Sequence, residues 1–117
     1  MELRNAALGD VPMLVASGAL DHSTSGTLQT ALDRWLTGGF HIVFLDLADV
    51  SHMDSGGLSV IVAGVQALRR GGWLGIIGPN PGVRDLLEKT GLLDDPNLRV
   101  FASRQEALII TGERAST

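Results

Sequence analysis

One stretch of the sequence decides the fold, and it reads Phe44-Leu-Asp-Leu-Ala-Asp-Val-Ser-His-Met-Asp-Ser-Gly-Gly-Leu-Ser-Val-Ile-Val-Ala-Gly64. It begins inside a near-continuous apolar run, which is typical of a strand covered on both faces. From Leu58 onward, apolar residues recur at the three-and-four spacing of one helical face. Between them lies Met53-Asp-Ser-Gly-Gly57, a tight turn of capping residues and glycines. We therefore predict a strand over 41–47 that leads through this turn into a helix ending near Arg70.

Length and composition narrow the class of protein. The 117 residues suffice for one domain, 44% of them are hydrophobic, and the net charge is −4. Because no basic stripe is present, we predict no direct nucleic-acid partner. The absence of cysteine excludes disulfides and thiolate sites and suits a reducing cytosol. No signal peptide or membrane-length apolar run is visible. We expect a single cytoplasmic domain over 1–112 and a flexible tail over 113–117.

The rest of the chain predicts a hairpin followed by alternating helices and strands. Such alternation implies mostly parallel strands joined by helical crossovers. Glycines and capping residues delimit the segments. The remaining expected elements are strands over 2–7, 11–17, 73–78 and 98–101, and helices between Asp21 and Gly38, from Asn80 to Gly91, and from a capping box at Ser103–Glu106 to Gly112.

Few residues in the chain suggest catalysis. Ser55 lacks the Gly-x-Ser-x-Gly elbow of a nucleophile, and Gly56-Gly57 lacks the lysine of a phosphate-binding loop. The three histidines, at positions 22, 41 and 52, are too scattered to predict a metal site. The acids Asp46 and Asp49 are expected to be solvated loop residues or caps. We therefore predict neither an enzyme nor a metal or cofactor site.

The turn itself permits two interpretations. In the simpler one, Asp54 or Ser55 is an ordinary helix N-cap and the glycines ease a sharp bend. In the other, the hydroxyl of Ser55 lies where a phosphate would be tolerated by the helix N-terminus. Phosphorylation there would add up to about two negative charges beside Asp54 and change what the surface can bind.

Three motifs together resemble one known family. They are Phe44-Leu-Asp-Leu with Met53-Asp-Ser-Gly-Gly-Leu-Ser-Val-Ile61, Gly18-Ala-Leu-Asp21, and Pro81-Gly-Val-Arg-Asp-Leu-Leu87 with Thr90-Gly-Leu92. In order and spacing they are similar to the STAS domains of bacterial anti-sigma-factor antagonists and sulphate-transporter tails. The resemblance implies an α/β fold with a mixed sheet of four or five strands and helices packed mainly on one face.

For function, the resemblance implies a regulatory binding module. Members of the antagonist family sequester an anti-sigma factor, typically a serine kinase, and so release a sigma factor. The kinase ends the interaction by phosphorylating the second serine of an Asp-Ser-Ser-Gly-Leu motif. That position is Gly56 here, which leaves Ser55 as the candidate phosphoacceptor. The residues that the resemblance places at the partner-binding helix N-terminus are Asp21, Asp54, Ser55, Gly56, Gly57, Leu58 and Ser59.

Several alternatives stay open at this point. The domain could escape phosphorylation and bind its partner constitutively. It could instead be a STAS scaffold or accessory subunit of another pathway, such as a stressosome-like assembly or lipid transport. An anion- or nucleotide-binding module at Gly56-Gly57 is a further option, as is a homodimer.

Overall fold

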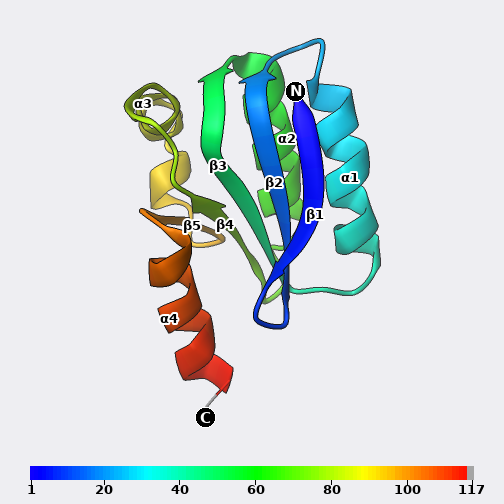
Figure 1. The fold of residues 1–117 in the computed structure, drawn as a ribbon, viewed down its shortest axis with the longest axis vertical. Helices are drawn as coiled ribbons and strands as arrows, with labels where there is room; N and C mark the ends of the chain where they lie inside the picture. Colours follow the sequence, from blue (N-terminus) through cyan, green and yellow to red (C-terminus); the bar gives the residue numbers. More distant parts are fainter. Residues whose placement is uncertain (116–117) are drawn as a thin grey trace.

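The computed structural model describes the backbone of residues 1–115 and the side chains of residues 1–110. Its centre is a five-stranded mixed sheet with the order β1-β2-β3-β4-β5, in which only β1 runs antiparallel (Figure 1). The elements are β1 (Glu2–Leu8), β2 (Val11–Leu20), α1 (Ser25–Thr37), β3 (Ile42–Met53), α2 (Ser55–Ala67), β4 (Trp73–Ile77), α3 (Pro81–Lys89), the 3-10 turn η1 (Leu92–Asp94), β5 (Leu98–Phe101) and α4 (Arg104–Ala115). The predicted α/β class and mixed sheet are confirmed.

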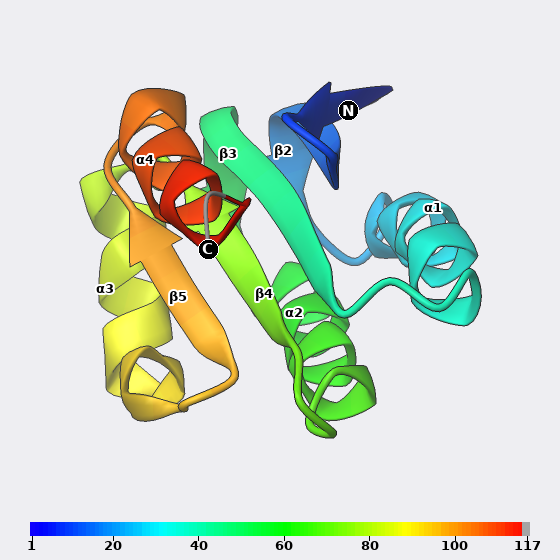
Figure 2. The same cartoon turned by 90° about the horizontal axis from the view of Figure 1, so that it is seen from below.

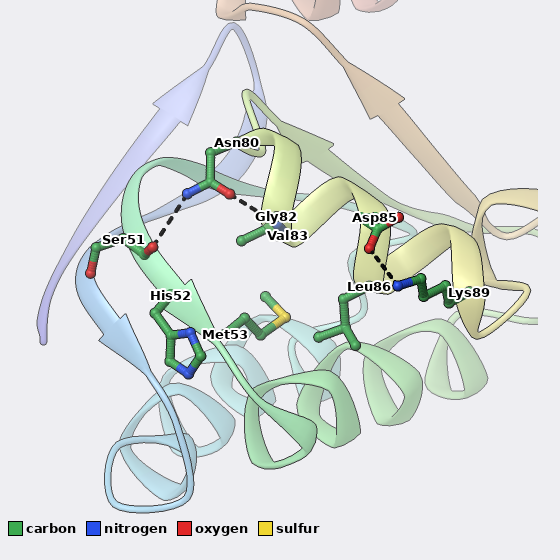
Figure 3. A pocket seen from close by; sticks show the side chains of 9 residues that line it. All are labelled: Ser51, His52, Met53, Asn80, Gly82, Val83, Asp85, Leu86 and Lys89. Atoms are coloured by element: carbon green, nitrogen blue, oxygen red, sulfur yellow. Dashed lines mark hydrogen bonds and ion pairs between the residues drawn. The ribbon is translucent and has the colours of Figure 1, made fainter.

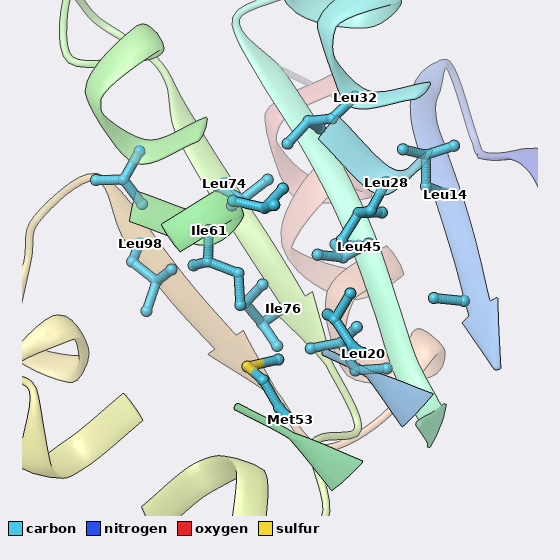
Figure 4. Close-up of a cluster of buried hydrophobic side chains, with 14 of the residues drawn as sticks. Leu14, Leu20, Leu28, Leu32, Leu45, Met53, Ile61, Leu74, Ile76 and Leu98 are labelled. Atoms are coloured by element: carbon cyan, nitrogen blue, oxygen red, sulfur yellow. The ribbon is translucent and has the colours of Figure 1, made fainter. Parts of the chain in front are cut away.

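The helices divide unequally between the two faces of the sheet. Helices α1, α2 and α3 cover one face and α4 covers the other, as Figure 2 shows. The larger core lies under the three helices, and its leucines and isoleucines come from both the sheet and the helices that cover it (Figure 4). A smaller aromatic core lies under α4, where Phe44 meets Trp73 and Phe101 edge-on. Burial of these apolar surfaces supplies the main driving force for folding.

Strand β3 is longer than the apolar run predicts, because it continues from Leu47 to Met53. Beyond Leu47 most side chains are exposed and only Val50 and Met53 are buried. Irregular pairing with β2 interrupts the alternation of buried and exposed side chains there. The sequence therefore lacks the two-residue period that is typical of a strand. The prediction of an end at residue 47 was therefore wrong. Helix α2 ends at Ala67, three residues before the predicted end.

One carboxylate on the α4 side of the sheet is buried. Asp46, expected to be a solvated loop residue or cap, is 3% exposed in the middle of β3. Its Oδ2 lies 2.6 Å from the Nε of Arg104, and its Oδ1 accepts a hydrogen bond from the Ala48 amide. The expectation for Asp46 was wrong, because a contact across 58 residues cannot be seen in a local pattern. Asp49 is exposed, although it lies in β3 rather than in a loop.

The last helix starts as the capping residues predict and ends later. The amide of Glu106 donates to the hydroxyl of Ser103, and the Glu106 carboxylate accepts from the Ala102 amide. The helix then continues past Gly112 to Ala115, so the predicted end at Gly112 was wrong. Of the predicted tail, residues 116–117 lie outside the described residues. Within the described part of the chain, no helix is both long and apolar enough to span a membrane.

Candidate functional site

Asp54 organises the turn between β3 and α2. It is the N-cap of α2, and its Oδ1 accepts hydrogen bonds from the amides of Gly56 at 2.8 Å and Gly57 at 3.4 Å. The backbone carbonyl of Asp54 accepts from the Leu58 amide. The amides of Gly56 and Gly57 are thus taken by the cap of their own helix. This arrangement does not favour the alternative of an open anion site at Gly56-Gly57.

The neighbouring loop, between β2 and α1, is organised by Asp21. Its Oδ1 accepts hydrogen bonds from the amide and the hydroxyl of Ser23, at 2.9 and 2.6 Å, and from the amide of Thr24. The hydrogen bond from the Ser23 hydroxyl is the main reason why the pKa of Asp21 lies below its ordinary value. Asp21 therefore fixes the shape of the loop, whose backbone lies beside the turn of Asp54.

A contact between the two loops joins His22 to Asp54. The imidazole Nδ1 lies 3.0 Å from the Oδ2 of Asp54, and the His22 amide donates to the same oxygen at 3.4 Å. Sequence reasoning treated His22 as isolated. The available signal was that β2 and β3 are parallel neighbours, so the residues that follow them meet at one edge of the sheet. Figure 1 shows the two arrowheads side by side.

The two glycines of the turn have no room for a side chain. A Cβ at Gly56 would lie 2.8 Å from the Cα and 2.9 Å from the backbone nitrogen of His22. A Cβ at Gly57 would lie 2.6 Å from the Cγ of Leu20. Both approaches are closer than Cβ atoms tolerate. The backbone of the loop after β2 therefore covers Gly56, which is buried.

Ser55 is the exposed hydroxyl at the start of α2. In the described part of the chain its Oγ makes no hydrogen bond, whereas the Oγ of Ser59 donates to the Gly56 carbonyl at 2.7 Å. Leu58 is half-buried between these two serines. Helix α2 carries no charged side chain from Ser55 to Ala67. The structure thus brings together all seven residues of the predicted site, with Ser55 and Ser59 outermost and Gly56 and Gly57 beneath.

Replacing Asp54 with alanine should lower the melting temperature by a few degrees near neutral pH, because α2 loses its cap. Desolvation raises the pKa of Asp54, but hydrogen bonds from His22 and the two glycine amides outweigh it, so this pKa lies below 3.8. The unfolded chain then binds the proton more readily, so the stabilisation is present above pH 3.8 and is lost as pH falls through the native pKa.

Thermal unfolding followed by circular dichroism at several pH values measures this difference. Asp54→Asn is the matched control, because asparagine also caps helices but carries no charge. We expect both variants to depend less on pH than the unaltered chain, because neither carries the carboxylate. Asp54→Asn should also keep most of the neutral-pH stability. If Asp54→Ala and the unaltered chain had parallel pH profiles, the ionised cap would not be the stabilising group.

Comparisons with known proteins agree on one family. The model of the STAS domain matches residues 4–107. The "Anti-sigma F factor antagonist" of Paenibacillus polymyxa is 37% identical over 79 residues, which span 65% of this chain and 67% of that relative.

Two solved structures are similar over nearly the whole chain. A candidate anti-sigma factor antagonist from Thermotoga maritima superposes with a TM-score of 0.80 at 27% identity, over 91% of each chain. An anti-sigma factor antagonist from Mycobacterium paratuberculosis gives a TM-score of 0.83 at 22% identity, over 93% of this chain and 92% of the other. The second likeness concerns the fold alone.

Proposed function

The chain belongs to the STAS domain family, and from this premise we propose that it is an anti-sigma factor antagonist, a regulatory module that binds an anti-sigma factor and thereby frees a sigma factor. The relatives described as antagonists support this function over a scaffold or transport accessory. The observation that carries the proposal is the capped turn at the start of α2, where Asp54 binds the amides of Gly56 and Gly57 and leaves Ser55 exposed on a helix without charged side chains.

The proposed docking surface is the exposed part of this turn. It is built from the outermost atoms of Asp21, Asp54, Ser55, Leu58 and Ser59, with Gly56 and Gly57 shaping the backbone beneath. Hydrogen bonds hold both carboxylates in place before a partner arrives, so little order has to be gained on binding. Basic residues on the partner would complement Asp21 and Asp54 and would mainly raise the association rate.

As a finer part of the proposal, the partner is an anti-sigma factor of the serine-kinase type, and Ser55 is its phosphoacceptor. The Ser55 hydroxyl is exposed, whereas position 56 has neither a hydroxyl nor space for one. A phosphate on Ser55 would lie beside the Asp54 carboxylate, and the amides of Gly56 and Gly57 already donate to that carboxylate. The added charge would therefore stay on the docking surface and oppose rebinding.

Intact-protein mass spectrometry of the chain purified from its own cells tests the phosphorylation, with Ser55→Ala as the control. A phosphate-sized mass increase that disappears in Ser55→Ala supports the switch. If no growth condition gives such an increase, the chain binds constitutively or is controlled in another way. Light scattering of the same preparation tests the proposed option of a homodimer, and cell fractionation tests the proposed cytoplasmic location.

Ser55→Asp should weaken binding to the anti-sigma factor by about tenfold, because it adds a charge beyond those of Asp21 and Asp54, and this charge has to be desolvated in the interface without a partner of its own. Titration calorimetry with the purified partner measures the affinity. Ser55→Asn is the control, because asparagine has nearly the same shape as aspartate but no charge. This variant should bind almost as the unaltered chain does. Equal weakening by both variants would mean that shape, rather than charge, controls docking at this turn.

A further inference from the structure

A groove opens beside the docking surface, between the end of β3 and α3, and its volume is about 270 Å³. Figure 3 shows Met53 and Leu86 facing each other across it, with Val83 behind. Met53 and Val83 are buried, and Leu86 is half-buried. The floor is therefore apolar, although the groove is open to solvent.

We propose that this groove binds one aromatic side chain of the partner, a tyrosine or a tryptophan. The inference rests on the proposed function for the existence of a partner, and it adds the chemistry of the residue that anchors it. The groove is smaller than the roughly 300–1,000 Å³ pockets that take whole small molecules. It exceeds the roughly 150 Å³ cavity that holds a benzene ring, so its size matches one large side chain.

The floor favours an aromatic ring over an aliphatic chain. The Met53 side chain presents a polarizable thioether, which makes favourable contacts with the edges of aromatic rings. Leu86 adds apolar surface on the opposite wall, and Val83, which is 2% exposed, lies behind it. A flat ring laid against half-buried Leu86 and the small exposed part of Met53 would exclude the remaining water from this wall, and aromatic residues in such pockets contribute most to many interfaces.

The rim carries no uncompensated charge, which disfavours a charged occupant. The carboxylate of Asp85 lies 2.9 Å from the ammonium of Lys89, so the two rim charges neutralise each other. Asn80 is also engaged: its Nδ2 donates to the Val50 carbonyl at 3.0 Å, and its Oδ1 accepts from the Val83 amide at 2.9 Å. A guanidinium or carboxylate would have to compete with this ion pair for a partner of opposite charge.

The open end of the groove offers polar groups to the tip of the ring. The hydroxyl of Ser51 and the imidazole of His52 are exposed, and in the described part of the chain neither makes a hydrogen bond. A tyrosine hydroxyl or an indole N–H could remain hydrated there or reach these groups. Tyrosine and tryptophan suit sites with one apolar and one wet end, which is the arrangement seen here.

The position of the groove connects it to the docking surface. Met53 directly precedes Asp54, so the same strand end supplies the groove wall and the cap of α2. A partner seated on Ser55 would pass over this wall. The groove therefore offers a pocket at the edge of a rather polar turn, where a single buried aromatic residue would slow dissociation.

The chain has three methionines, Met1, Met13 and Met53, which makes carbon-13 methyl spectroscopy a direct test. The probes are N-acetyl-tyrosinamide, N-acetyl-tryptophanamide and, as the charged comparison, N-acetyl-argininamide. We expect both aromatic probes to shift the Met53 methyl signal in a saturable way, through the ring current. Met13, buried in the core under α4, is the internal control and should not move.

Leu86→Trp fills the groove from within and should abolish the saturable Met53 shift, while an unchanged Met13 signal reports an intact fold. The proposal is overturned if Met53 does not respond, if its response persists in Leu86→Trp, or if the arginine probe acts as strongly as the aromatic ones. These probes need no anti-sigma factor. A failure of the proposed function therefore leaves the titration unchanged, and a failure of the groove leaves the Ser55 measurements unchanged.

Discussion

Gly56→Ser should destabilise the chain, although the resemblance to the antagonist family implies a serine at this position. Its Cβ would lie 2.8 Å from the Cα of His22 and 3.0 Å from the Oδ1 of Asp54. Because the nearest obstacle is backbone, the loop after β2 has to move, and the contact between His22 and Asp54 is lost. We expect the free energy of unfolding to fall by about 1–3 kcal/mol, as overpacking typically costs. Urea denaturation measures this value.

Gly26→Ser is the matched control for Gly56→Ser, because no atom from beyond its chain neighbours and the surrounding helix backbone lies within 4 Å of the Cβ position at Gly26. It places the same side chain in the first turn of α1 and should leave stability nearly unchanged. Equal denaturation midpoints for the two variants would show that the loop accommodates a side chain at position 56. The expected difference would explain Gly56 physically: in this chain, glycine allows the loop to close over the start of α2.

Arg104→Ala should also destabilise the chain strongly, because it leaves the Asp46 carboxylate buried without its charged partner. The side chain of Asp46 is 5% exposed, whereas that of Arg104 is 47% exposed. Since water reaches one side of the pair, we expect a loss of about 1–3 kcal/mol, less than for a fully enclosed pair. Urea denaturation gives the loss, and hydrogen exchange of the α4 amides should show earlier opening of that helix.

Two further variants separate the buried charge from other effects of Arg104→Ala. Adding Asp46→Asn removes the charge while keeping an oxygen for the Ala48 amide, so the double variant should recover much of the stability. Lys89→Ala breaks a pair whose carboxylate, on Asp85, is 56% exposed, and it should change little. A double variant as unstable as Arg104→Ala would assign the loss to packing of the arginine instead.

The fold was predictable because most of its determinants are local. The apolar run before Asp54 and the helical spacing after it are patterns of neighbouring residues. The glycines and prolines that end the helices and strands also act over only a few residues. The end of β3 was not predictable, since Ser51 and His52 are exposed on a strand that continues beyond the apolar run. Irregular pairing with β2 broke the alternation that would have revealed it.

The sequence predicted which residues form the site, but not how they contact one another. Asp54 and Ser55 were identified from the motif, but the sequence does not show that the carboxylate satisfies both glycine amides. Nor does it show that His22 meets Asp54, because this contact depends on the register that pairs Leu20 with Met53. The groove beside the turn requires α3 to be positioned against β3, which only tertiary structure defines.

The identity between strand order and chain order has a consequence for how the molecule forms. Each strand pairs with the strand next to it in sequence, so the hairpin closes a short loop and each later strand is joined to its neighbour by one helical crossover. Such a topology favours rapid folding for an α/β protein, and during synthesis each new strand meets an edge that already exists. The contact from Arg104 back to Asp46 joins residues 58 positions apart, and we expect it to form after the sheet.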